Sequence, residues 1–175
     1  LGTAETIARV HLRQELRPGA AAMGRLVLES PLLARGGDRL LLRSYSPVGV
    51  IGGGTVLDPL PPPGRPVWSE GLDALEPSAR LRAVVERRPR GVAVGLLTIL
   101  LGVTDGELAP LLGDPLLCRK DGMLVPATAV ERAAAHATAL VAAHHERKPA
   151  EAGLSLETAR QELEAFGAAG AVALE

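Results

Sequence analysis

Arg39, Arg43 and Tyr45 are the side chains of this sequence best suited to hold a ligand. They occupy odd-numbered positions of the run RLLLRSY, so a β-strand there would place all three on one face. Arginine makes paired hydrogen bonds to phosphate oxygens, which predicts a surface that contacts the phosphates and riboses of a nucleic acid. The residues alone equally allow a solvated strand face that binds nothing, because Arg and Tyr are common at surfaces.

Three consecutive glycines, Gly52, Gly53 and Gly54, follow and invite comparison with phosphate-binding loops. A dinucleotide fingerprint needs a strand, G-x-G-x-x-G and then a helix, whereas TVLDP here continues as a strand and meets a proline. The sequence also lacks G-x-x-x-x-G-K-[ST], so neither a nucleotide nor another cofactor is expected. The glycines predict a turn, a bulge or a close backbone approach, and they join the candidate binding residues.

The remaining reactive side chains form no catalytic or metal-binding pattern. His144 and His145 are neighbours that point apart on a helix, and His136 lies two turns earlier, whereas helical metal ligands are spaced i and i+4. Cys118 has no second cysteine or paired histidine nearby, which predicts a small buried residue. No catalytic residue and no metal ligand are expected, and the chain is not expected to be an enzyme.

Composition describes an ordinary globular protein with an uneven charge distribution. The 175 residues are 47% hydrophobic and carry a net charge of −1, and no run of about 18 apolar residues predicts contact with a membrane. Residues 1–58 carry seven basic against five acidic side chains, whereas residues 127–175 carry four against seven, so phosphate contacts are expected in the N-terminal part. The lone cysteine favours a cytoplasmic setting, and the start at Leu1 suggests a longer parent protein.

The expected fold class is β + α multidomain. Short alternating runs over residues 4–58 predict strands of a barrel or sandwich, giving a first domain at 1–58. The run DPLPPPGRP cannot form regular structure because its prolines fix φ and lack donors, so residues 59–74 are expected to be an extended linker with few contacts.

Residues 75–126 predict a winged helix. Apolar spacing indicates helices over 77–88 and 92–101, and a capping box at Thr104 opens a third helix. Two apolar runs around Asp121-Gly122 then predict a hairpin, and three helices followed by a hairpin is the order of a helix-turn-helix with a wing.

Residues 127–175 predict the start of a second winged helix. They begin with a long helix over 127–147, and Ser155 caps another that extends to Phe166. The run GAAG at 167–170 indicates a break, so this module is expected to be incomplete.

The third predicted helix, DGELAPLL, offers no Arg or Lys to a groove, and aromatic residues make up only 2% of the chain. Both features favour a spacer or docking role for the helical modules. Two alternatives stay open: a DNA-binding winged-helix regulator, and a structural adaptor between domains whose arginine face is inert.

Three runs of residues resemble the third domain of bacterial selenocysteine-specific elongation factors. They are GTAE, ARGGDRLLLR and SYSPVGVIGGGTVLDP, at residues 2–5, 34–43 and 44–59. The resemblance extends over residues 2–59 and continues in the order of elements over 75–166. It implies a fragment that comprises the third, barrel domain of an elongation-factor-type protein and the first winged-helix modules.

In that family a GTPase domain and two barrels resemble those of the general tRNA-delivering elongation factor, and terminal winged helices bind the selenocysteine insertion hairpin of the messenger RNA. The resemblance implies that this barrel contacts selenocysteyl-tRNA, with Arg43 and residues 52–54 near the acceptor and T arm. The ribosome is the further expected partner. GTP and Mg²⁺ are expected in a GTPase domain of the parent, and that domain, the first barrel strands and the hairpin-binding modules are all expected outside this chain.

Overall fold

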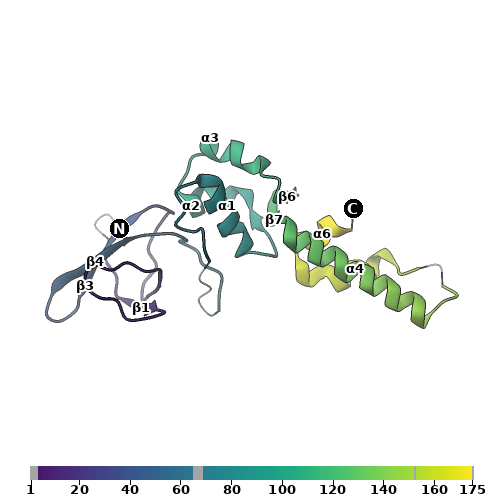
Figure 1. The fold of residues 1–175 in the computed structure, drawn as a ribbon, viewed down its shortest axis with the longest axis horizontal. Coiled ribbons are helices and arrows are strands. Elements are labelled where there is room, and N and C mark those ends of the chain that lie inside the picture. The colour runs from purple at the N-terminus through teal and green to yellow at the C-terminus, as the bar shows by residue number, and fades with distance from the viewer. Residues whose placement is uncertain (1–3, 65–68, 152, 175) are drawn as a thin grey trace.

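The computed structural model describes residues 4–64, 69–151 and 153–174. The molecule is elongated and bent (Figure 1). The β-hairpins lie at one end, a helix-rich unit forms the middle, and α4 (Ala127–Arg147) extends towards the other end. Residues 2–3 of the GTAE motif and residues 65–68 of the predicted linker lie outside the described residues.

Four strands form two separate antiparallel pairs. β1 (Ala8–Leu12) pairs with β2 (Gly24–Leu28), and β3 (Arg39–Ser44) pairs with β4 (Gly49–Thr55). The alternation over residues 4–58 predicted β1, β2 and β3, whereas β4 was expected as two short runs on either side of the glycines. No hydrogen-bonded ladder joins the two pairs within residues 4–64, so the described strands do not close into a barrel by themselves.

The glycine run lies inside a strand, so its description as a turn is wrong. Residues 52–54 form the middle of β4 and pair with residues 40–42, whereas the chain reverses at residues 45–48, which include a cis Ser46–Pro47 peptide. The register shifts between Leu42 and Arg43, which leaves one extra residue on β4. The predicted bulge is therefore present directly beside the glycines, and cross-strand pairing overrides the turn preference of glycine.

Helices and a hairpin build the central unit in the predicted order. Its elements are α1 (Pro77–Glu86), α2 (Val94–Leu101), α3 (Asp105–Leu108), the 3-10 turn η1 (Ala109–Gly113), β6 (Leu117–Lys120) and β7 (Met123–Pro126). Leucines and valines of these elements fill one core, which includes Leu81, Val84, Val85, Leu97, Leu100 and Leu124.

The ends of these elements follow the local signals. Gly102 ends α2 with φ 69°, in the left-handed region that glycine adopts without strain. Thr104 and Glu107 form a reciprocal capping box at the start of α3. Asp121 and Gly122, at φ 48° and 75°, make the two-residue turn between β6 and β7.

One strand was missed. The second helix, predicted from Val92, begins at Val94, because Val92–Ala93 forms β5 and pairs with β7. The resulting antiparallel sheet has the order β5-β7-β6. A two-residue strand has no periodicity of its own, so only its partner specifies it.

The C-terminal part is helical. Helix α4 matches the predicted bounds, and α5 (Leu156–Leu163) begins after Ser155, whose hydroxyl accepts a hydrogen bond from the Thr158 amide at 3.1 Å. The 3-10 turn η2 (Glu164–Phe166) and α6 (Ala168–Ala173) follow.

A break is predicted at residues 167–170, but only Gly167 forms one. Residues 168–170 belong to α6. Gly167 turns the chain with φ 59°, and α6 starts immediately after it. A Cβ atom at Gly167 would lie 2.5 Å from the carbonyl oxygen of Arg90, and Ala169 is fully buried. These small residues let α6 pack closely against the central unit. Composition alone does not distinguish a closely packed helix of small residues from a loop.

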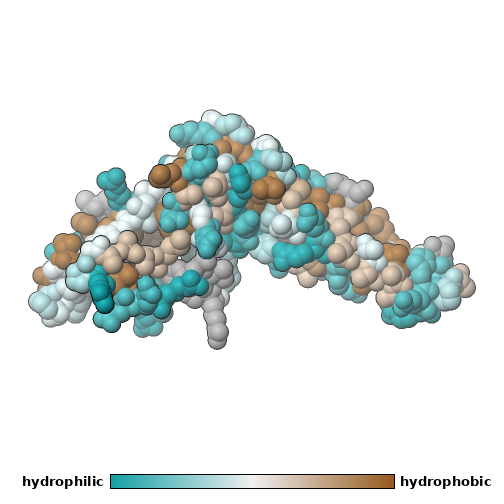
Figure 2. All heavy atoms as spheres, viewed as in Figure 1, coloured by the Kyte–Doolittle hydropathy of each residue, from teal (hydrophilic) through white to brown (hydrophobic). Residues whose placement is uncertain are grey.

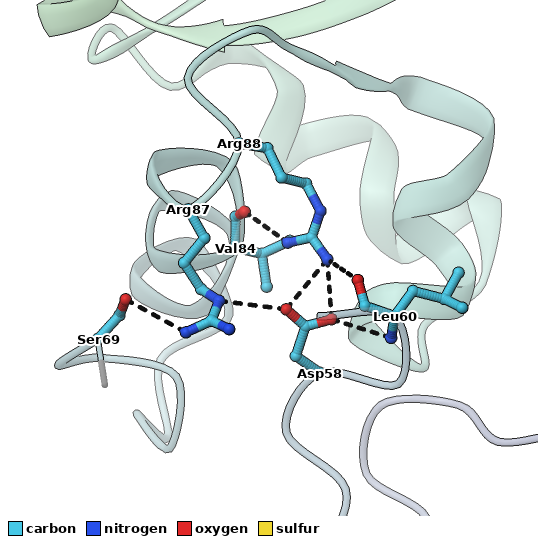
Figure 3. Close-up of polar contacts among 6 residues, drawn as sticks. All are labelled: Asp58, Leu60, Ser69, Val84, Arg87 and Arg88. Carbon is cyan, nitrogen blue, oxygen red and sulfur yellow. Dashed lines mark hydrogen bonds and ion pairs between the residues drawn. The ribbon is translucent and has the colours of Figure 1, made fainter. Parts of the chain in front are cut away.

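The proline-rich segment is anchored at both ends. Asp58 directly precedes it and binds Arg87 and Arg88 of the central unit, and the Leu60 carbonyl accepts a hydrogen bond from Arg88 Nη2 at 2.7 Å (Figure 3). Leu72 is buried in the helical core. The expectation of few contacts across 59–74 is wrong at these positions, and the bounds 1–58, 59–74, 75–126 and 127–175 stay a prediction.

Within the described residues no single helix is long and apolar enough to cross a membrane. One pair of segments meets the requirement together by length and composition, namely Val94–Leu101 with Asp105–Gly113, and it is bent by 106°.

Candidate nucleic-acid interface

Strand β3 positions the two arginines as the alternation predicts. Arg39, Leu41 and Arg43 are exposed, whereas the residues between them are half-buried. A strand rises about 3.4 Å per residue, so the Cα atoms of the two arginines lie roughly 13 Å apart along one face. Such a face can offer two guanidinium groups to successive parts of a phosphate backbone.

The glycines of β4 leave the neighbouring backbone uncovered. Gly53 lies directly opposite Leu41, so no β4 side chain stands between the two arginines on this face. A Cβ atom at Gly52 would meet nothing within 4 Å, and one at Gly54 would meet only the Leu40 side chain, at 3.8 Å. Folding therefore does not require glycine at these two positions, and the exposed β4 backbone can be approached closely from outside.

Arg43 has an acidic neighbour that the sequence does not indicate. Its Nη1 atom lies 3.8 Å from Oε1 of Glu5, and the two side chains are 55% and 85% exposed. An exposed ion pair of this kind contributes at most about 1 kcal/mol, so a phosphate could displace Glu5 at small cost. Within the described part of the chain Arg39 has no ion-pair partner.

Tyr45 lies beyond the end of β3, in the reversal at residues 45–48, so its assignment to the strand is wrong by one residue. Its side chain is 87% exposed, and Val50 and Ile51 are also well exposed. Figure 2 shows hydrophobic atoms among hydrophilic ones at the end of the molecule where this hairpin lies. The structure thus places the arginines together on one strand, with Tyr45 at the tip of the same hairpin.

The central unit offers no comparable face on its third helix. The α3–η1 segment turns Leu108 into the core, with Leu111 and Leu112 packed against it. Its exposed side includes Asp105 and Glu107, and none of residues 105–113 is basic. The exposed surface of this segment is therefore acidic, as the sequence DGELAPLL predicts, and it would repel a phosphate backbone.

The histidines and the cysteine make packing contacts. The His136 ring lies 5.4 Å from the Phe166 ring between centroids, and His144 Nε2 lies 3.2 Å from Glu151 Oε2 without hydrogen-bond geometry. The Lys148 ammonium, which donates to Glu151 at 2.8 Å, is the main reason that the pKa of this carboxyl is lowered. Cys118 on β6 is half-buried against the Val125–Ala169 cluster.

Two hairpins with an open arginine face, joined to a helix-rich unit, define a protein of the β + α class. Residues 1–63 match the family model described as "Selenocysteine-specific elongation factor, beta-barrel domain". This segment is therefore similar to the β-barrel domain of the selenocysteine-specific elongation factors, which agrees with the resemblance of residues 2–59. No curated protein matches the chain.

Proposed function

We propose that this chain is the tRNA-contacting and spacer part of a translation factor that delivers selenocysteyl-tRNA to the ribosome. The observation that carries the proposal is the family match at residues 1–63, which contains the exposed strand face with Arg39 and Arg43. The excess of basic residues over 1–58 supports the same assignment, because phosphate contacts need positive charge.

Residues 75–126 form, in this proposal, a winged helix that acts as a spacer. The order α1, β5, α2, α3, β6, β7 supports that fold, as does the β5-β7-β6 sheet. The acidic α3–η1 surface argues against a DNA-reading role, since a recognition helix presents Arg, Lys, Asn or Gln to base edges. Residues 127–175 continue the spacer towards modules that bind the insertion hairpin of the messenger RNA.

We assign no catalytic step to these 175 residues. GTP and Mg²⁺ belong, in this proposal, to a GTPase domain of the whole factor, because the sequence here contains no P-loop motif. Such a factor would work where ribosomes translate, in the cytoplasm.

A binding titration tests the proposal. The chain is titrated with selenocysteyl-tRNA and with a general elongator tRNA, at several salt concentrations. We expect binding whose logarithmic affinity falls linearly with the logarithm of salt concentration, because phosphate contacts release counterions. Absence of binding at low salt would contradict the tRNA-contacting role and favour the inert adaptor.

A further inference from the structure

A buried ion network joins the end of the β-hairpin segment to helix α1. Oδ2 of Asp58 accepts a hydrogen bond from Arg87 Nε at 3.2 Å, and Oδ1 accepts one from Arg88 Nη2 at 2.8 Å. The three side chains are 5%, 9% and 13% exposed, respectively. Figure 3 shows the two guanidinium groups converging on this carboxylate, with Ser69 and Leu60 completing the cluster.

The network specifies one arrangement of the β-hairpin segment relative to helix α1. A carboxylate taken out of water is stable only when charged partners replace its lost hydration, and here both partners lie just after α1. If the hairpin segment moved away, the carboxylate would leave the cations that neutralise it. Separation of the two parts would therefore expose three groups that now satisfy one another.

A second contact is made by backbone alone. The Gly36 amide donates a hydrogen bond to the Ile99 carbonyl of α2 at 2.9 Å. A Cβ atom at Gly36 would lie 2.2 Å from the Leu100 oxygen, and one at Gly102 would lie 1.8 Å from the Gly36 oxygen. The loop before β3 thus rests on the C-terminal end of α2 at a distance that admits no side chain on either partner.

The two contacts are held at a fixed spacing. The Gly37 amide donates a hydrogen bond to the Val56 carbonyl, and the Val56 amide donates one to the Asp38 carbonyl, both at 2.8 Å. These two bonds tie the loop before β3 to the chain after β4. Leu57, next to Asp58, packs against the helical core. Two separate anchors on one tied segment remove the rotation that a single anchor would still allow.

We infer that β3, β4 and the central helical unit (residues 77–126) form one rigid body, locked by the Asp58–Arg87–Arg88 network and the Gly36–Gly102 contact. The prolines at positions 59–63, which directly follow Asp58, then do not act as a hinge. The face that carries Arg39 and Arg43 consequently has a constant direction relative to the central unit. This inference concerns the joint and stands independently of what the arginine face binds.

Distances between two spin labels test the inference. Leu41→Cys and Arg119→Cys place labels at exposed positions of β3 and β6, in a Cys118→Ser background of the full 175-residue chain. Pulsed electron resonance should give one narrow distance distribution. In Gly36→Ala, where the new methyl group meets the Leu100 oxygen, and in Asp58→Asn, we expect this single peak to spread over several distances.

Matched controls separate the joint from general effects. Gly95→Ala adds a methyl group in open space on α2, and Asp73→Asn changes an exposed carboxylate, so both should keep the narrow peak. A broad distribution in the unaltered joint would overturn the inference even if a variant failed to fold. A narrow, unchanged peak in both joint variants, with circular dichroism showing intact helices, would overturn it as well.

Discussion

Oδ1 of Asp58 and Nη2 of Arg88 lie 2.8 Å apart, although thirty residues separate them in the chain. Asp58 lies near the end of the segment that matches the family model, residues 1–63, and Arg88 follows the first helix of the next unit. A domain boundary drawn at the proline run therefore divides an ion network. A fragment that begins after Asp58 would leave two arginines beside an empty position.

Asp58→Asn should destabilise the chain by about 3–5 kcal/mol, because removing one member of a buried ion network leaves charge without compensation. Urea unfolding followed by circular dichroism measures the change. Asp73→Asn, at an exposed carboxylate, should stay within about 0.5 kcal/mol of the unaltered chain. Equal effects of the two substitutions would show that the network contributes nothing to stability.

Arg43→Ala in the whole factor should weaken tRNA binding by about 1–3 kcal/mol, the usual loss for a hydrogen bond to a charged group. The salt slope should also fall by roughly the contribution of one phosphate contact. Arg132→Ala, at an exposed position of α4, serves as the control and should change neither quantity. If affinity and slope survive Arg43→Ala, the arginine face is only solvated surface.

The 175-residue chain should not bind the selenocysteine insertion hairpin tightly. Residues 127–175 carry four basic against seven acidic side chains, and the α3–η1 segment is acidic where it is exposed, so both repel an RNA backbone. Fluorescence anisotropy at near-physiological salt measures the affinity, with a scrambled hairpin for comparison. Selective nanomolar binding would move RNA recognition into residues 75–175 and end the spacer interpretation.

Glu107→Gln should remove a pH-dependent part of the stability. Hydrogen bonds from the amide and the hydroxyl of Thr104 lower the pKa of Glu107 below its ordinary value of 4.5. A lowered pKa means that the charged carboxylate stabilises the folded state above about pH 4.5, and that this contribution is lost as pH falls through the folded pKa.

The measurement is the free energy of unfolding of both proteins between neutral and acidic pH. The difference between them should be present at neutral pH and should vanish on acidification. Glu86→Gln, on the exposed side of α1, provides a control outside the capping box. A difference that stays constant with pH would mean that the charge of Glu107 has no part in the cap.

Elements with strong local signals could be predicted from the sequence, and contacts between distant segments could not. The capping box at Thr104, the turn at Asp121-Gly122 and the bounds of α4 depend on neighbouring residues and agree with the structure. Strand β5 depends on pairing with β7, thirty residues later. The sequence of the proline run predicts a free linker, because nothing in the sequence around Arg87 and Arg88 indicates that they bind Asp58.

The candidate site shows the same difference between local signals, which the sequence reveals, and contacts between distant segments, which it does not. Alternation along RLLLRS placed Arg39 and Arg43 on one exposed face, since the period of a strand is a local property. The ion pair with Glu5 and the position of residues 52–54 inside β4 both depend on which segments lie side by side. Composition near the glycines favoured a turn, and only the register with β3 decides otherwise.

Helix α4 begins at Ala127, immediately after β7 ends at Pro126, and its 21 residues extend about 31 Å at 1.5 Å per residue. Helix α6 packs against the first turns of α4 through Ala129 and Ala169. The helix is therefore a lever arm clamped at its root. A tilt of about 10° at that clamp would displace the distal end by about 5 Å on this geometry. Small changes around Gly167 are consequently amplified at the end of the molecule that is farthest from Arg39 and Arg43.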